Sequence, residues 1–300
     1  CDKAAKGELV IPDEIEGLPV TSIGEAAFVA CTSLTSITIP DSVTSIGNMA
    51  FYRCESLTSI IIPDSVTSIG ELAFSGCSGL TSITIPENVT NIGNGAFRAC
   101  NGLTSIAVPD SVISIGFRAF ENCENLSLIK LGDSLASIES QVFFNCRALT
   151  SIIIGNSVTS IEDWAFENCI SLTSITIPNS VVIVGFGAFQ GCQSLASITI
   201  PDSVTSIGKE AFLGCTSLTS ITIPDGVISI EDWAFHRCSS LASVTIPDSV
   251  TTIGDLAFAN CFSLKSITIP QAFHSEDEAS RLDIDKLWPD GFALPDSSSK

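Results

Sequence analysis

Apolar residues recur along this chain with a period of 23, and each period repeats one short pattern of apolar and polar positions. The columns that contain Phe28, Cys31 and Leu34 each hold eleven residues without a gap. The frame LxxIxIPDSVxSIGxxAFxxCxx describes the unit, so the chain is an array of copies. The recurrent apolar set of residues 34–56 is Leu34, Ile37, Ile39, Val43, Ile46, Ala50, Phe51 and Cys54.

The start of each period predicts a strand. Ile37 and Ile39 alternate with Ser36 and Thr38, which is the period of two expected for a half-buried strand. Pro40 ends the strand, because proline has no N–H with which to continue a ladder inside a sheet.

The rest of the period predicts a turn, a second strand and a helical turn. Residues 41–42 are Asp-Ser, whose short side chains bond nearby backbone amides in turns. Residues 43–46 fit a shorter second strand, which Gly47 ends. Residues 48–53 fit one short helical turn that directs Phe51 into the core.

A single 23-residue unit is too small to fold alone, because its few apolar side chains cannot offset the entropy lost on ordering the backbone. Stacked copies share walls and gain burial on two sides, as in a quasi-one-dimensional solenoid. Equivalent strands then run parallel. At a strand spacing of about 4.8 Å, the array extends roughly 50 Å.

This spacing of Leu, Ile, Ile-Pro, Val, Ile-Gly, Ala-Phe and Cys resembles the BspA-type leucine-rich repeat of bacterial and some protist surface proteins. The likeness covers residues 7–270, and residues 7–31 are similar to the irregular first repeat of that family. The resemblance implies a right-handed leucine-rich-repeat solenoid of eleven coils with a parallel sheet on its concave face. It also implies a cell-surface or secreted role in adhesion and protein binding, and it carries over no catalytic residue.

Both ends of the chain depart from the repeat, and a solenoid needs caps there. Ser275 and Glu278 form a capping-box signature that begins an expected helix. We expect an irregular N-terminal cap over residues 1–21, the solenoid over 22–270, a C-terminal helical cap over 271–295 and a disordered tail over 296–300.

The charge of the chain excludes several classes of partner. The net charge is −20 and the pI is about 4.2, which argues against nucleic acid and against anionic membrane surfaces. No apolar run is long enough to span a bilayer, and no signal-peptide pattern is present. A leader of a secreted parent would therefore have been removed or lie outside this sequence.

The cysteine column predicts buried free thiols, because free cysteine packs as a small hydrophobe. Disulfides between adjacent rungs are an alternative, since the rung spacing falls within the allowed Cα separation. A zinc site is a further alternative, although no CxxC or CxxH pair accompanies the column. Cys1 stands apart as the remnant of an earlier coil, a part of the cap or a lipidated first residue that tethers the array.

The outward positions of the main strands form two columns of small hydroxyls, which begin at Ser36 and Thr38. Such residues keep a sheet soluble and pair well across strands, and the same face offers a broad binding surface. A local apolar departure amid similar copies indicates a contact patch, although drift in the middle coils explains it nearly as well. The candidate ligand-binding residues on this concave face are Ile61, Ala107, Leu128, Lys130 and Ile153.

An acidic column follows the strands. Carboxylates one rung apart repel one another, so calcium bridging is chemically reasonable, but the turn role of Asp before Ser explains the column without metal. We therefore expect no metal site and no cofactor. The calcium candidates are Asp41, Asp64, Glu87, Asp110 and Asp133.

Catalytic signatures are missing from the sequence. His236 and His274 have no serine, cysteine or carboxylate partner in a known spacing, and no phosphate loop or nucleophile motif occurs. Trp164 and Trp233 share one column, where partial burial and a ligand platform are both possible readings. We expect a non-enzymatic, monomeric surface or secreted solenoid that binds a protein or glycan. The alternative is a structural spacer or display scaffold without its own ligand.

Overall fold

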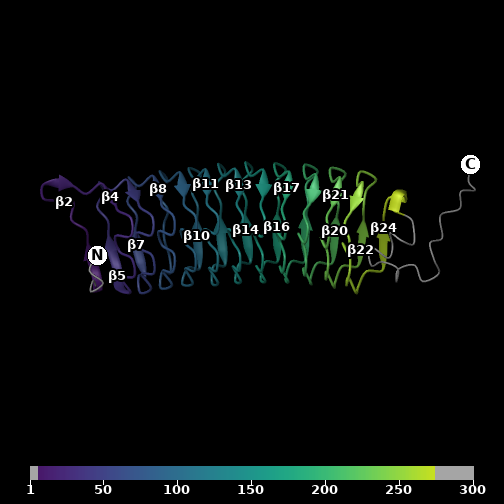
Figure 1. Cartoon of the computed structure of the whole chain (residues 1–300), viewed down its shortest axis with the longest axis horizontal. Helices are drawn as coiled ribbons and strands as arrows, with labels where there is room; N and C mark the ends of the chain where they lie inside the picture. Colours follow the sequence, from purple (N-terminus) through teal and green to yellow (C-terminus); the bar gives the residue numbers. More distant parts are fainter. Residues whose placement is uncertain (1–5, 274–300) are drawn as a thin grey trace, which may run out of the picture.

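The computed structural model describes residues 6–273, and in it each 23-residue period forms one turn of a β-solenoid with about eleven turns. Successive coils lie side by side along the long axis of the molecule, from the N-terminal to the C-terminal end (Figure 1). The parallel solenoid predicted from the repeat is therefore confirmed.

The main strands begin at the recurrent Ser-Ile positions, and their side chains alternate between solvent and core. They pair in parallel and form sheets of three, three and five strands. The main strands are β1 (Lys6–Val10), β5 (Ser33–Thr38), β7 (Ser59–Ile61), β10 (Ser105–Ala107), β12 (Leu128–Lys130), β14 (Ser151–Ile153), β16 (Ser174–Thr176), β18 (Ser197–Thr199), β20 (Ser220–Thr222), β22 (Ser243–Thr245) and β24 (Ser266–Thr268).

A second row of two-residue strands follows the Asp-Ser turn of each coil. These strands form parallel sheets of five and six strands. They are β4 (Ser22–Ile23), β6 (Ser45–Ile46), β8 (Ser68–Ile69), β9 (Asn91–Ile92), β11 (Ser114–Ile115), β13 (Ser137–Ile138), β15 (Ser160–Ile161), β17 (Ile183–Val184), β19 (Ser206–Ile207), β21 (Ser229–Ile230) and β23 (Thr252–Ile253).

The register between coils equals the sequence period, so each residue lies beside its own counterpart. Ile37 pairs with Ile60, for example, and Ile129 pairs with Ile152. The pairing of β1 with β5 departs from this register, with a shift between Gly7 and Glu8. No strand forms at residues 80–86, so the main sheet is interrupted between β7 and β10, and a second interruption lies between β14 and β16.

The predicted helical turn at residues 48–53 is wrong. The segment consists of consecutive hydrogen-bonded turns, in which the N–H of Ala50 donates to Gly47 and the N–H of Cys54 donates to Phe51. Met49 and Arg53 have φ values of 54° and 58°, which a right-handed helix does not admit. Both stand third in a turn, the position that a type II turn places at positive φ.

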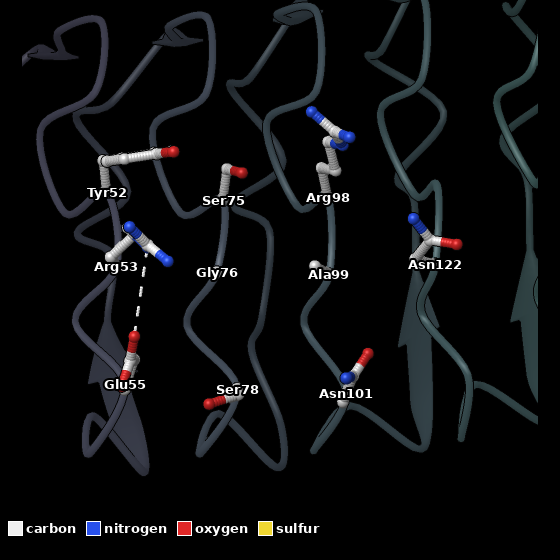
Figure 2. Close-up of a pocket in the computed structure, with 10 residues that line it drawn as sticks. All are labelled: Tyr52, Arg53, Glu55, Ser75, Gly76, Ser78, Arg98, Ala99, Asn101 and Asn122. Atoms are coloured by element: carbon white, nitrogen blue, oxygen red, sulfur yellow. Dashed lines mark ion pairs between the residues drawn. The ribbon is translucent and has the colours of Figure 1, made fainter.

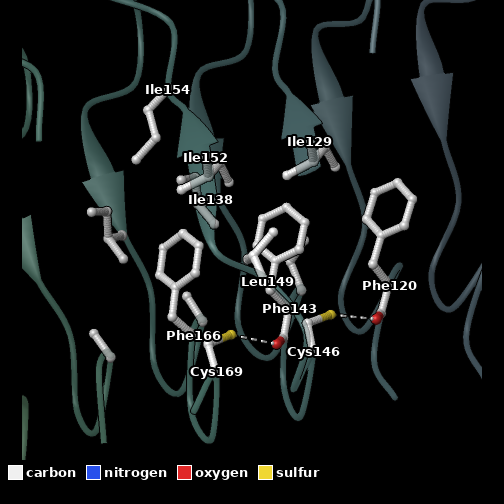
Figure 3. Packing of buried hydrophobic residues seen from close by; sticks show 14 of the residues in the cluster. Phe120, Ile129, Ile138, Phe143, Cys146, Leu149, Ile152, Ile154, Phe166 and Cys169 are labelled. Atoms are coloured by element: carbon white, nitrogen blue, oxygen red, sulfur yellow. Dashed lines mark hydrogen bonds between the residues drawn. The ribbon is translucent and has the colours of Figure 1, made fainter. Parts of the chain in front are cut away.

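The phenylalanine column forms a continuous stack through the core. Rings from Phe28 to Phe258 lie parallel to their neighbours, with centroids 5.2–5.6 Å apart. Phe120, Phe143 and Phe166 are fully buried among isoleucine and leucine side chains (Figure 3). Each coil thus completes the interior of its neighbours.

The cysteine column packs beside the phenylalanines as predicted. The cysteines from Cys54 to Cys238 are buried free thiols. The Sγ–H of Cys146 donates to the carbonyl oxygen of Phe120 at 3.2 Å, and Cys169 donates to Phe143 at the same distance (Figure 3). The thiol therefore satisfies a carbonyl of the preceding coil.

Hydroxyl side chains also join the coils. Ser65 Oγ donates to the carbonyl of Val43 at 2.6 Å, and Thr67 Oγ1 donates to that of Thr44 at 3.2 Å. The Ser after Asp in the frame therefore has a structural role, because it satisfies a backbone carbonyl one coil earlier.

The N-terminal coil includes β1, which pairs with β5, and a short antiparallel hairpin of β2 (Glu14–Ile15) and β3 (Leu18–Pro19). At the other end, a 3-10 helix η1 (Gln271–Phe273) follows β24 and buries Phe273. Most of the expected C-terminal cap, the expected tail, and Cys1 and His274 lie outside the described residues. Residues 6–273 contain no helix that could span a bilayer.

Candidate functional site

The candidate binding residues lie on the exposed side of the main strands. In β12, Leu128 and Lys130 are exposed and Ile129 between them is buried. In β14, Ile153 is exposed and Ile152 is buried. The alternation of the strand therefore directs these side chains to solvent.

The register of the sheet brings four of the five candidates together. Lys130 pairs with Ala107 on one side and with Ile153 on the other, while Leu128 lies in the neighbouring column of the same strand as Lys130. Leu128 and Ile153 keep 48% and 58% of their surface exposed. We call these four residues the strand-face patch.

Ile61 lies apart from the strand-face patch. It is 77% exposed on β7, and the strandless coil at residues 80–86 separates it from Ala107. Its neighbour in register is Thr38, which in turn pairs with Val10, a residue 70% exposed. Sequence reasoning missed Val10, because the irregular first period hides its alignment with Thr38.

A shallow cavity of about 160 Å³ borders the strand-face patch where the main sheet is interrupted. It lies between the strandless coil, through Ile83 and Ile85, and the next coil, through Ala107 and Pro109. The missing strand thus leaves a hollow beside one member of the patch.

The calcium candidates all lie exposed at the turns after the main strands. The Oδ1 of Asp110 accepts a hydrogen bond from the N–H of Asp133 at 3.1 Å, which joins two turns directly. Within residues 6–273, no group of three or more His, Cys, Asp or Glu is placed to hold a metal ion. The expectation of no metal site therefore stays a prediction, with calcium bridging between neighbouring coils as its alternative.

The two tryptophans of the shared column lie at the turns, where Trp164 is half-buried and Trp233 is exposed. The ring of Trp164 lies 4.7 Å from that of Phe186, and Trp233 is 39% exposed with Lys209 Nζ 5.1 Å from its ring centroid. Both have positive φ, at 54° and 57°. Each indole thus has a neighbour from an adjacent coil.

The turns of the second to fifth coils form a further hollow that the sequence analysis did not single out. This turn-edge groove has a volume of about 370 Å³, and polar side chains line most of it (Figure 2). Tyr52 and Arg53 lie in one coil, Arg98 and Asn101 lie two coils further on, and Asn122 follows. The concentration of arginine in residues 53–118 of an acidic chain was the available signal.

A buried carboxylate orders the arginines beside this groove. Glu121 Oε2 lies 3.0 Å from Arg98 Nε and 3.5 Å from Arg118 Nε, and its side chain is only 9% exposed. Arg118 Nε donates to Gln141 Oε1 at 2.6 Å, and its guanidinium lies 4.6 Å from the ring centroid of Phe117. Two guanidinium groups thus share one carboxylate in a fixed arrangement.

The thiols of the core are unreactive near neutral pH. Burial raises the pKa of Cys54 to about 11 and that of Cys123 to about 12. Because the thiolate is the reactive form of cysteine, these groups cannot act as nucleophiles near neutral pH.

Comparison with protein families gives a match along nearly the whole solenoid. The chain matches the family described as BspA type leucine rich repeat region (6 copies) over residues 8–126, 91–216 and 159–280. A comparison with curated proteins gives no match.

Solved structures of bacterial repeat proteins are similar to this chain. A leucine rich cell surface protein from Faecalibacterium prausnitzii A2-165 is 32% identical, with 93% of this chain and 90% of that chain covered and a TM-score of 0.51. A leucine-rich repeat protein from Bacteroides ovatus is 30% identical over the same shares, with a TM-score of 0.49. The pneumococcal vaccine antigen PcpA is 19% identical, with 98% and 83% covered and a TM-score of 0.56, and shares the fold.

Proposed function

Because this chain belongs to the BspA-type leucine-rich repeat family, we propose that it is a non-enzymatic binding protein of the cell surface or extracellular space. The relative from Faecalibacterium prausnitzii is itself named a cell surface protein, which supports this location. A lipid tether at Cys1 would serve the same location, and mass spectrometry of Cys1 in the membrane fraction of the native host tests it.

The proposed ligand is a protein or glycan that binds the exposed face of the main strands, which the family resemblance predicts to be concave. The observation that carries the proposal is the strand-face patch, because the hydroxyl columns change there to an apolar surface around one lysine. An exposed apolar patch that is rimmed by polar residues is typical of an interaction site. Ile61 forms a separate contact point on the same face.

A binding assay with a matched control tests this site. The double variant L128D/I153D places charges on two exposed residues, so the fold should remain intact while an apolar contact is lost. The control S220D/T245D carries the same charges in the same two columns, four coils further along. Purified proteins are applied to immobilised extracellular-matrix proteins, bacterial surface components and glycans.

We expect the native protein and S220D/T245D to bind a shared ligand, and L128D/I153D to bind it at least about tenfold more weakly. A structural spacer that displays another module is the second candidate, favoured by the near-identity of most coils. No binding in the whole panel would support the spacer instead. Equal binding by all three proteins would exclude the strand-face patch as the ligand site.

A further inference from the structure

The turn-edge groove carries positive charge in a strongly acidic protein. The chain has 33 acidic and 13 basic residues, yet Arg53 and Arg98 line this groove, and Arg118 lines an adjoining hollow that shares Arg98 with it. Arg98 and Arg118 share the single carboxylate of Glu121, so one positive charge of this group is not neutralised by it. Their side chains remain 43% and 40% exposed and can reach a ligand.

Arg53 provides a second positive charge at the other end of the groove. Its nearest carboxylate is Glu55, at 4.0 Å, and both side chains are more than half exposed. Such an exposed pair contributes little, so the guanidinium of Arg53 is readily available to another anion. Arg53 and Arg98 are two coils apart, and neighbouring coils are 5.2–5.4 Å apart at their phenylalanine rings. The two guanidinium groups can therefore contact different parts of one extended ligand.

The uncharged lining of the groove has the chemistry of a sugar site. Ser75, Ser78, Asn101 and Asn122 offer hydroxyl and amide groups, and Tyr52 offers an aromatic ring (Figure 2). Asn101 Oδ1 is buried and has no hydrogen-bond partner in the protein, so it is an acceptor in need of a donor. Sugar hydroxyls supply such donors, and the apolar face of a pyranose packs on aromatic rings.

We propose that the turn-edge groove binds a short acidic oligosaccharide whose sugar rings carry carboxylates. Arg53 and Arg98 pair with carboxylates on different rings, Tyr52 packs on a ring, and Asn101 accepts a hydroxyl hydrogen bond. The site goes beyond the proposed function, because it lies at the turns and uses no residue of the strand-face patch.

Isothermal titration calorimetry with three probes tests the proposal. Trigalacturonic acid carries a carboxylate on each ring, maltotriose is a neutral trisaccharide, and hexaglutamate is an acidic peptide without sugar rings. The variants are Arg53→Gln and Tyr52→Ala, and the control is Arg237→Gln, which has the same place in the repeat eight coils later. All changed side chains are at least partly exposed, and circular dichroism checks that each variant folds.

We expect saturable binding of trigalacturonic acid, and binding of maltotriose and hexaglutamate at least about tenfold more weakly. Arg53→Gln and Tyr52→Ala should each weaken trigalacturonate binding by about tenfold, because a charge-assisted bond or a stacking contact is lost. Arg237→Gln and L128D/I153D should leave it unchanged, which separates this site from the strand-face patch.

Three results would overturn the proposal. One is the absence of saturable trigalacturonate binding up to about 10 mM. Another is equal or tighter binding of maltotriose or hexaglutamate, the latter indicating an acidic-peptide site. The third is a loss in Arg237→Gln as large as that in Arg53→Gln.

Discussion

At the scale of single residues, two columns of the turns adopt positive φ throughout the array. One column contains Arg53, Ala99 and Gly214, with φ of 58°, 56° and 72°. A non-glycine residue in this region costs about 1–2 kcal/mol. The column includes three glycines and four asparagines, the residue types that tolerate this conformation best. That enrichment was visible in the sequence and indicated a left-handed position rather than a helical turn.

Replacement of Gly214 by alanine tests the conformational cost at this column. A Cβ at Gly214 would meet no heavy atom closer than 4.0 Å, so the substitution adds strain without a clash. We expect Gly214→Ala to lower the free energy of unfolding by about 1 kcal/mol. The reverse change, Ala99→Gly, should be neutral or slightly stabilising. Urea unfolding measures both, and destabilisation by Ala99→Gly comparable to that of Gly214→Ala would contradict the argument.

At the scale of elements, the strands and the core were predictable, whereas the way in which the turns of different coils converge was not. The alternation Ser-Ile-Thr predicts the buried and exposed positions of the main strands, because period two follows directly from backbone geometry. The strand-face patch follows from the same alternation plus the register. The turn-edge groove does not, because it depends on turn geometry and on which side chains of different coils converge. The missing strand at residues 80–86 has no signature in its residues, which match the frame.

The phenylalanine stack makes each coil depend on both of its neighbours. Phe143 is fully buried between Phe120 at 5.6 Å and Phe166 at 5.3 Å, whereas the partly buried Phe28 stacks on Phe51 alone within the described residues. We expect Phe143→Ala to lower the free energy of unfolding by about 3–5 kcal/mol, and Phe28→Ala to lower it distinctly less. Urea titrations followed by circular dichroism compare the two. Equal losses would show that burial in the stack does not set the stability.

At the scale of the whole molecule, the cysteine column links folding to pH. Burial raises the pKa of the nine thiols from Cys54 to Cys238 in the folded state. In the unfolded chain these thiols ionise at about pH 8.5. Above that pH the unfolded state binds fewer protons than the folded state, so stability falls as pH rises. The contribution of the cysteine column to the stability of the fold is fully present below about pH 8 and is lost in the alkaline range.

The free energy of unfolding should therefore fall unusually steeply as the pH rises above about 8.5. Once a thiol is ionised in the unfolded chain, it lowers the free energy of unfolding by about 1.4 kcal/mol for each further pH unit. Nine such thiols give a slope on the order of 10 kcal/mol per pH unit. Urea midpoints measured from pH 7 to pH 10 test this. The double variant Cys100→Ala/Cys123→Ala provides the control, because it should start less stable and show a shallower slope. A midpoint that stays flat to pH 10 would be inconsistent with buried neutral thiols.

The interruption of the main sheet also has a mechanical meaning. The hydrogen bonds between coils run along the long axis, so tension applied to the two ends would load them directly. Between residues 82–84 and β10 the main-strand ladder is absent, and a shallow cavity lies there instead. The second-row ladder β8–β9–β11 still crosses this joint, and the main sheet is also interrupted between β14 and β16. Under a pulling force of the kind that flow exerts on an anchored molecule, the joint at residues 82–84 would be among the places that separate before the continuous ladders do.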